Sequence, residues 1–326
     1  METLRQDYTI STPELKSVLD MSPQGIHHIL KSSKIDTFIK NNRKHISPLG
    51  IRKLLESRGY KYKKEVISFS VVKGGVGKTS LSHSFAIRAS QYGARVLCVD
   101  LDQQGNLSQA FGIDPTDHYT IFDYIKKEEK ICLDEAIIPI TNNLHLIPSN
   151  MNISFLDRYL QLTNAALHRV LKEIFDEVKD RYDYIIQDCP PAISSVTAAS
   201  ILASDRIIIP ITPSKFAIEG LKATIEEATS LSDKFQKPNL AFNILFNRYD
   251  ARKSSSNDFL RLVMGHPIYK DLLLNSFIRE NIELENCINK KQSVFDNVKK
   301  SFSREDIDLL TQEIMGLDIV SNNKEQ

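Results

Sequence analysis

Two adjoining stretches decide the fold: Val66-Ile67-Ser68-Phe69-Ser70-Val71-Val72 runs directly into Lys73-Gly74-Gly75-Val76-Gly77-Lys78-Thr79-Ser80. The β-branched first stretch predicts a strand, and Leu81, Phe85 and Ala86 follow the glycines at helical spacing. A glycine-rich turn between a strand and a helix lets backbone N–H groups surround a phosphate, and the helix dipole favours the same anion. The sequence therefore predicts a phosphate-binding loop.

This loop is a variant of the ordinary P-loop. The usual G-x-x-x-x-G-K-[ST] pattern would place its first glycine where Val72 stands, and a second lysine, Lys73, lies beside the glycines instead. We expect Lys78 to contact β- and γ-phosphate oxygens and the Thr79 hydroxyl to ligate Mg²⁺. The predicted nucleotide-binding residues of the loop are Lys73, Gly74, Gly75, Val76, Gly77, Lys78, Thr79 and Ser80.

Further apolar stretches predict more strands. They cover residues 95–100, 144–148, 182–188, 206–211 and 240–246. Asp100 ends one of these stretches and Asp188 another, and acidic side chains at the carboxyl ends of strands lie at the edge where open α/β sheets bind ligands. The expected fold class is α/β, with a mostly parallel twisted sheet flanked by helices.

The variant loop and the segment Asp100-Leu101-Asp102-Gln103-Gln104-Gly105-Asn106 resemble the ParA/MinD group of deviant Walker ATPases, most closely the ParA partition proteins. The resemblance runs from Val66 to about residue 300. Gln103 stands where the family usually has proline, and Gln187 stands where it usually has an apolar residue.

The resemblance implies a role for each matching residue. Lys73 would reach across an ATP-bound sandwich dimer to the partner's phosphates, Asp102 would orient the attacking water, and Lys78 would complete the catalytic set. The implied metal residues are Thr79, Asp100 and Asp188, with Asp188 in the Walker B position. Asn247 and Pro213 would contact the adenine.

Residues 1–64 form a predicted N-terminal domain, and residues 65–326 form the ATPase domain. Residues 1–65 carry a net charge of +6, whereas the rest of the chain carries −5. Helix starts at Ser11, Ser22 and Ser47 and a basic hairpin at residues 37–46 resemble winged helix-turn-helix DNA-binding domains. A small helical protein-interaction module is the alternative.

Several side chains are candidate DNA contacts, because basic surfaces meet phosphates and polar side chains can reach base edges. In the N-terminal domain they are Gln24, His27, His28, Lys31, Arg43 and Lys44. In the ATPase domain they are Arg252, Lys253, Arg261, Lys290, Lys291, Lys299 and Lys300.

Composition excludes several classes of protein. The chain has 326 residues, 41% of them hydrophobic and 25% charged, which is typical of a folded globular protein. No apolar run approaches the roughly 18 residues of a transmembrane helix, and the N-terminus lacks signal-peptide character. Four scattered cysteines predict reduced core residues without a disulfide framework. The expected location is the cytoplasm, associated with the nucleoid.

The expected function is that of a ParA-type ATPase that segregates a plasmid or chromosome. It would use ATP and Mg²⁺, form an ATP-dependent homodimer that binds DNA non-specifically, and respond to a ParB-type centromere-binding protein. The N-terminal domain would add operator autorepression, and no membrane is expected. One alternative is a MinD-like membrane positioning ATPase, which the acidic segment 303–310 disfavours, and another is a transcription regulator that senses ATP.

Overall fold

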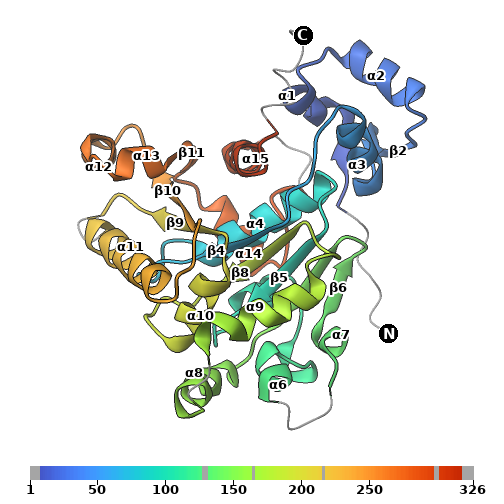
Figure 1. Ribbon diagram of the computed structural model, residues 1–326. Coiled ribbons are helices and arrows are strands. Elements are labelled where there is room, and N and C mark those ends of the chain that lie inside the picture. The colour runs from blue at the N-terminus through green and yellow to red at the C-terminus, as the bar shows by residue number, and fades with distance from the viewer. Residues whose placement is uncertain (1–7, 127–130, 164–165, 215–216, 297–300, 318–326) are drawn as a thin grey trace.

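The computed structural model describes residues 8–126, 131–163, 166–214, 217–296 and 301–317 (Figure 1). Within them, the larger sheet has eight strands in the order β11-β10-β9-β4-β8-β5-β7-β6. Neighbouring strands are parallel except β6, which is antiparallel to β7. The strands are β4 (Glu65–Phe69), β5 (Val96–Asp100), β6 (Ile138–Thr141), β7 (Leu144–Ile147), β8 (Tyr184–Asp188), β9 (Arg206–Ile211), β10 (Ala241–Tyr249) and β11 (Leu273–Arg279).

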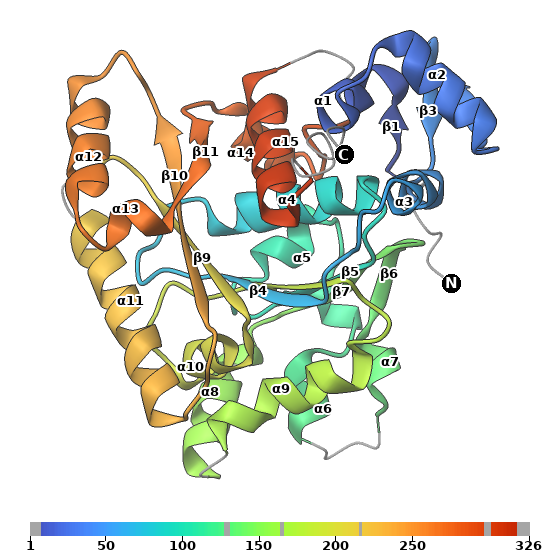
Figure 2. The same ribbon diagram turned by 45° about the horizontal axis from the view of Figure 1, so that its top comes forward.

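Helices cover both faces of this sheet, with α4, α14 and α15 on one side and α8, α9 and α10 on the other (Figure 2). Strands β5 and β8 are buried along their whole length, as expected for parallel strands between two helical layers. The helices of this part are α4 (Lys78–Gln91), α5 (Asn106–Ala110), η2 (Pro115–Asp117), α6 (Ile121–Lys126), α7 (Leu133–Ala136), α8 (Ile153–Leu162), α9 (Leu167–Val178), α10 (Ser195–Ala203), α11 (Ala217–Lys234), α12 (Ser254–Gly265), α13 (Tyr269–Leu272), α14 (Glu283–Asn289) and α15 (Phe302–Met315).

The predicted mostly parallel sheet flanked by helices is confirmed, but its edges differ from the prediction. Strands β6 and β11 had not been predicted, and β11 is an edge strand. Carboxylates of α15 accept hydrogen bonds from its backbone: Glu313 accepts from the N–H groups of Asn275 and Ser276, and Asp306 accepts from that of Arg279. These partners lie about thirty residues away, so local sequence patterns do not reveal them.

The N-terminal unit contains β1 (Ile10–Ser11), η1 (Thr12–Leu15), α1 (Lys16–Leu19), α2 (Pro23–Ser32), β2 (Thr37–Lys40), β3 (Arg43–Ile46) and α3 (Pro48–Ser57). Its strands form an antiparallel sheet in the order β1-β3-β2. The hairpin turns at Asn41 and Asn42, which have φ angles of 50° and 56°, a conformation that asparagine tolerates. Ser22 and Ser47 cap α2 and α3 with their hydroxyls, so the predicted helix starts and hairpin are present.

The N-terminal unit shares a hydrophobic core with the rest of the chain. One cluster of buried residues joins Ile10 and Leu15 to Phe85 of α4 and Leu310 of α15. The Tyr60 hydroxyl donates to the Met315 carbonyl at 2.8 Å. The predicted division at residue 64 therefore separates two secondary-structure units that pack against one another.

Asp183, just before β8, is expected to stabilise the packing of the N-terminal unit against the rest of the chain. Its buried carboxylate accepts from Arg52 of α3 at 2.6 Å and from Arg95 at 2.9 Å. Burial alone would raise the pKa of Asp183, but the hydrogen bonds from the two arginines outweigh it and lower that pKa below the ordinary aspartate value.

Replacing Asp183→Asn should reduce the free energy of unfolding at pH 7 by about 2–3 kcal/mol, because it leaves two partly buried guanidinium groups without their anion. Since the folded-state pKa is depressed, the carboxylate contributes fully above about pH 4 and loses its contribution as the pH falls further. Urea unfolding should thus separate wild type from variant at pH 7 and less so at pH 3. An equal difference at both pH values would contradict the assignment.

Two simpler predictions have mixed outcomes. None of the four cysteines forms a disulfide, but Cys132 is exposed, so the prediction that all four are core residues is wrong for it. Cys132 lies at the surface just before α7, where its backbone N–H donates a hydrogen bond to the Glu135 carboxylate.

Among the described helices, none combines the length and apolar character needed to cross a membrane.

Candidate nucleotide-binding site

The glycine-rich loop joins β4 to α4, as predicted. Gly75 and Gly77 have φ angles of 72° and 87°, which glycine adopts without steric cost, and Gly77 is the N-cap of α4. The Asn247 amide donates to the Val76 carbonyl at 2.7 Å, and a Cβ at position 77 would lie 2.6 Å from the Asn247 Nδ2. Asn247 therefore stabilises the loop. It lies within β10, whereas the sequence predicted a strand that ends at residue 246, just before it.

Thr79 and Asp188 meet at the carboxyl end of the sheet. The Thr79 hydroxyl donates to the Asp188 Oδ2 at 2.6 Å. The Asp188 Oδ1 is buried and has no hydrogen-bond partner among the described residues. A buried carboxylate oxygen without a partner, beside a hydroxyl, is the oxygen donor set that Mg²⁺ prefers, so these residues fit a magnesium ion.

Asp100 lies beside Asp188 because β5 and β8 pair in register at these residues. Its Oδ2 accepts from the Ser108 N–H at 2.9 Å and hydroxyl at 2.7 Å, and its Oδ1 accepts from the Asp102 N–H at 3.2 Å. Burial and the neighbouring Asp188 raise the pKa of Asp100, and burial raises that of Asp188. Both Asp100 oxygens are thus engaged with the loop, which sequence analysis had not foreseen.

Lys78 is the first residue of α4, directly after the glycine-rich loop. Its side chain is buried, and its ammonium Nζ lies 3.4 Å from the Lys73 carbonyl oxygen. Burial lowers the pKa of Lys78, while the charges of Asp188 and Asp102 act in the opposite direction. Asp102 is 9% exposed, and its Oδ1 accepts from the Gln104 N–H. A buried cation from the first turn of α4 and two carboxylates from other elements therefore lie beside the glycine-rich loop.

Lys73 contacts a distant segment of its own chain. Its Nζ donates to the Ser214 hydroxyl at 2.6 Å, in the segment after β9 that also contains Pro213. Ser214 is a residue that sequence analysis missed, since a single serine after a strand carries no motif. Ser80 lies half-buried in the first turn of α4.

Gln187, the polar residue of β8, is accommodated by three serines. Its amide donates to the hydroxyls of Ser68 at 2.9 Å and Ser204 at 3.0 Å and to the Ser200 carbonyl at 3.3 Å. These partners come from β4, α10 and the turn after α10. The Gln187 amide nitrogen therefore finds partners inside the fold, whereas its Oε1 is buried and has no hydrogen-bond partner among the described residues.

The candidate DNA contacts lie on several elements. The exposed ones of the N-terminal unit are Gln24, His27, His28 and Lys31 on α2 and Arg43 and Lys44 on β3. Arg252 pairs with Asp250 at 2.9 Å and Lys253 with Glu280. Arg261 lies 3.7 Å from Asp258, and Lys290 and Lys291 are exposed after α14. Lys299 and Lys300 lie outside the described residues.

Comparison with known proteins identifies the family. The pattern of the AAA-domain family matches residues 64–242, more than half of the chain. A virulence plasmid ParA family protein, pGP5-D of Chlamydia psittaci, is 29% identical over 77% of this chain and 94% of the relative. The chain belongs to the AAA-domain family. The sporulation initiation inhibitor protein Soj of Bacillus subtilis, which is 28% identical over 68% of this chain and 86% of its own length, is a further relative.

Solved structures share the fold of this AAA-domain protein. Apo McdA of Cyanothece has a TM-score of 0.67 at 22% identity and covers 78% of this chain and 98% of its own. A plasmid partition protein of Borrelia burgdorferi has a TM-score of 0.57 at 24% identity and covers 70% and 97%. At these identities the likeness establishes the α/β fold alone.

Proposed function

We propose that this protein is an ATP-dependent DNA partition ATPase. The observation that carries the proposal is the Thr79–Asp188 pair beside the glycine-rich loop, with an Asp188 oxygen that has no hydrogen-bond partner among the described residues. A nucleoside triphosphate with Mg²⁺ is the ligand that combines the anion for the loop with the cation for the carboxylate. Support for partition comes from the ParA and Soj relatives.

Each residue around the loop has a distinct task in hydrolysis. Lys78 and the N–H groups at the start of α4 neutralise the phosphates, and Thr79 and Asp188 hold Mg²⁺, which neutralises developing charge on the phosphate oxygens when bound. Asp100 keeps the loop of Asp102 in place through Ser108, and Asp102 orients the attacking water. Asn247 holds the loop through Val76, and together with Pro213 it borders the adenine.

A second subunit completes the site. The Lys73 ammonium donates to Ser214, in the segment after β9, and this contact supports a role for Lys73 at a partner's nucleotide once that bond opens. Hydrolysis then depends on a homodimer, because a charge supplied across the interface is absent from the monomer. ATP thereby controls assembly.

DNA is the macromolecular ligand. The unit of two short helices, α1 and α2, followed by a basic hairpin supports a winged helix-turn-helix that binds an operator through α2. Among the C-terminal candidates, Lys290 and Lys291 are favoured over Arg252 and Lys253, whose charges are paired with carboxylates. A ParB-type protein stimulates hydrolysis and releases the dimer from the nucleoid in the cytoplasm.

Membrane positioning has less support than DNA partition. The segment compared with a lipid-binding helix is part of α15, whose Ile307, Leu310 and Ile314 are buried against the rest of the chain. These apolar side chains of α15 therefore pack in the protein core, where a lipid surface cannot reach them.

ATP turnover should be measured on the full chain with and without a non-specific DNA duplex and a candidate ParB-type protein. We expect slow basal turnover that the two together raise at least about tenfold, and DNA affinity that falls with salt at a log-log slope of about −0.9 per phosphate contact. Binding of ATP without turnover under every condition would favour an ATP-sensing regulator, and DNA affinity independent of salt would argue against the DNA surface.

A further inference from the structure

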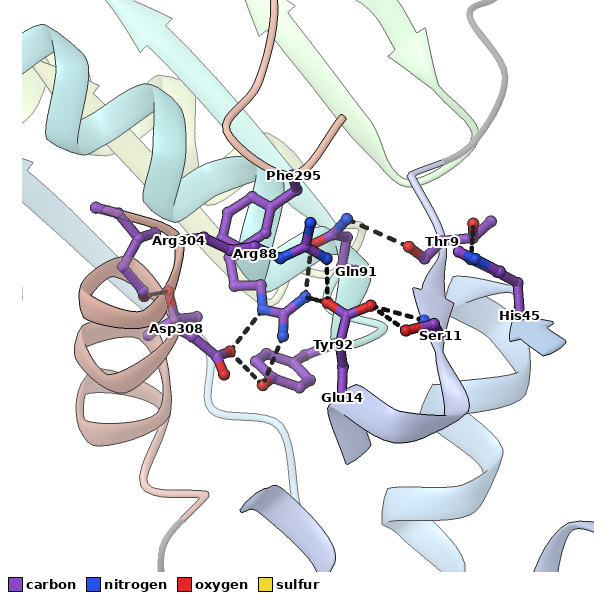
Figure 3. Close-up of polar contacts among 12 residues, drawn as sticks. Thr9, Ser11, Glu14, His45, Arg88, Gln91, Tyr92, Phe295, Arg304 and Asp308 are labelled. Atoms are coloured by element: carbon purple, nitrogen blue, oxygen red, sulfur yellow. Dashed lines mark hydrogen bonds and ion pairs between the residues drawn. The ribbon is translucent and has the colours of Figure 1, made fainter. Parts of the chain in front are cut away.

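A buried arginine near the end of α4 connects three parts of the chain (Figure 3). Arg88 is 1% exposed. Its guanidinium donates to Asp308 of α15 at 2.7 Å and to Glu14 of η1 at 3.2 Å. The rings of Tyr92 and Phe295 lie 4.6 Å and 4.7 Å from its central carbon. The charge of Arg88 is thus satisfied jointly by the N-terminal unit and the C-terminal helix.

Glu14 has additional partners that fix its position. Its Oε1 also accepts from Arg304 at 2.6 Å, and its Oε2 accepts from the Ser11 N–H at 3.0 Å as part of the capping box of η1. Burial alone would raise the pKa of Glu14, but Arg88 and Arg304 lower it to about 2. The carboxylate therefore stays charged at neutral pH, and its contacts cannot be lost without leaving buried charges unpaired.

The other end of α4 is the phosphate-binding loop. The helix has 14 residues, which corresponds to about 21 Å, and it is buried along nearly its whole length. Just after the helix, Gly93 packs so closely on α3 that a Cβ there would lie 2.7 Å from the Arg52 nitrogen and the Pro48 oxygen. A change in position or mobility of α4 must therefore be accommodated in the N-terminal unit.

We propose that Glu14, Arg88 and Asp308 couple nucleotide occupancy of the loop to the conformational stability of residues 8–57, with Arg88 as the positioning residue. The inference rests on the proposed nucleotide binding. A nucleotide bound at the first turn of α4 would restrain that helix, and the ion cluster at its other end would pass the restraint to the N-terminal unit. The coupling acts equally in both directions.

Hydrogen exchange measured by mass spectrometry on the full chain tests this coupling. In the wild type, a non-hydrolysable ATP analogue with Mg²⁺ should slow exchange in peptides of residues 73–80 and also, by about fivefold, in peptides of residues 10–32. In Glu14→Gln the slowing of exchange in residues 73–80 should remain. The slowing in residues 10–32 should fall below about twofold, because a neutral amide does not balance the charge of Arg88. Gln keeps the size and an acceptor oxygen, so the fold should persist.

Two further variants separate coupling from a structural role. Glu56→Gln removes the same charge from an exposed carboxylate, the one that pairs with Arg52 within α3, and should keep the wild-type response. Asp308→Asn removes the carboxylate that Arg88 contacts on α15, outside the N-terminal unit. It should weaken the response of residues 10–32. This second variant keeps the test decisive if Glu14→Gln loosens the N-terminal unit before nucleotide is added. The coupling is overturned if nucleotide protects residues 73–80 but leaves residues 10–32 of the wild type unchanged, or if Glu56→Gln and Glu14→Gln behave alike. If residues 73–80 are not protected either, nucleotide binding itself fails and the coupling fails with it.

Discussion

Replacing Lys78→Ala should weaken ATP binding at least about 100-fold, which corresponds to about 2.7 kcal/mol. The Lys78 ammonium is buried beneath the loop, where water cannot replace it as a partner for phosphate oxygens. Hydrogen bonds to charged groups are stronger than neutral ones, and truncating one partner of a buried charge pair costs several kcal/mol. Isothermal titration with Mg-ATP measures the affinity directly.

The matched control for this variant is Lys222→Ala, which removes an equal charge from the exposed face of α11, where Lys222 lies 3.7 Å from Glu226. It should bind ATP like the wild type. A thermal melt of Lys78→Ala without nucleotide checks that the protein is folded. Folded Lys78→Ala protein with wild-type affinity would show that the loop does not hold the triphosphate in the proposed way.

Replacing Asp102→Ala should leave ATP affinity within about threefold of the wild type and reduce stimulated turnover by about 10²–10³-fold, the range lost with a group that positions or deprotonates a nucleophile. Asp102 is 9% exposed and lies close enough to Lys78 to interact with its charge, whereas the Thr79 hydroxyl donates to Asp188 and not to Asp102. Loss of its charge therefore affects the attacking water more than the bound nucleotide.

Single-turnover hydrolysis and nucleotide affinity should be measured on the same Asp102→Ala preparation. Asp114→Ala is a suitable comparison, because Asp114 is an exposed carboxylate that caps η2, and it should keep normal turnover. If Asp102→Ala hydrolyses ATP at the wild-type rate, another group orients the water. If it loses ATP binding instead, Asp102 belongs to the nucleotide-holding residues.

Much of the site could be predicted from the sequence because its residues are consecutive. The loop from Lys73 to Ser80 carries its own chemistry: glycines at positive φ, a lysine and a hydroxyl at the start of a helix. Asp100 and Asp188 were predicted at one edge because parallel strands end together, and their in-register pairing agrees with that expectation. Local periodicity likewise predicted the helices and hairpin of the N-terminal unit.

Contacts between distant residues were decided only by the tertiary structure. Glu14 completes the local capping box of η1, yet its charge also balances Arg88 and Arg304, 74 and 290 residues away. Ser214 holds Lys73 across 141 residues, and α15 covers the edge of β11 with carboxylates. Periodicity and motifs report backbone preferences and local chemistry, whereas the partner of a buried charge is chosen by how the layers pack. Residue order alone is enough to predict the glycine-rich loop and the α/β class, whereas the packing of the layers fixes which distant elements contact that loop.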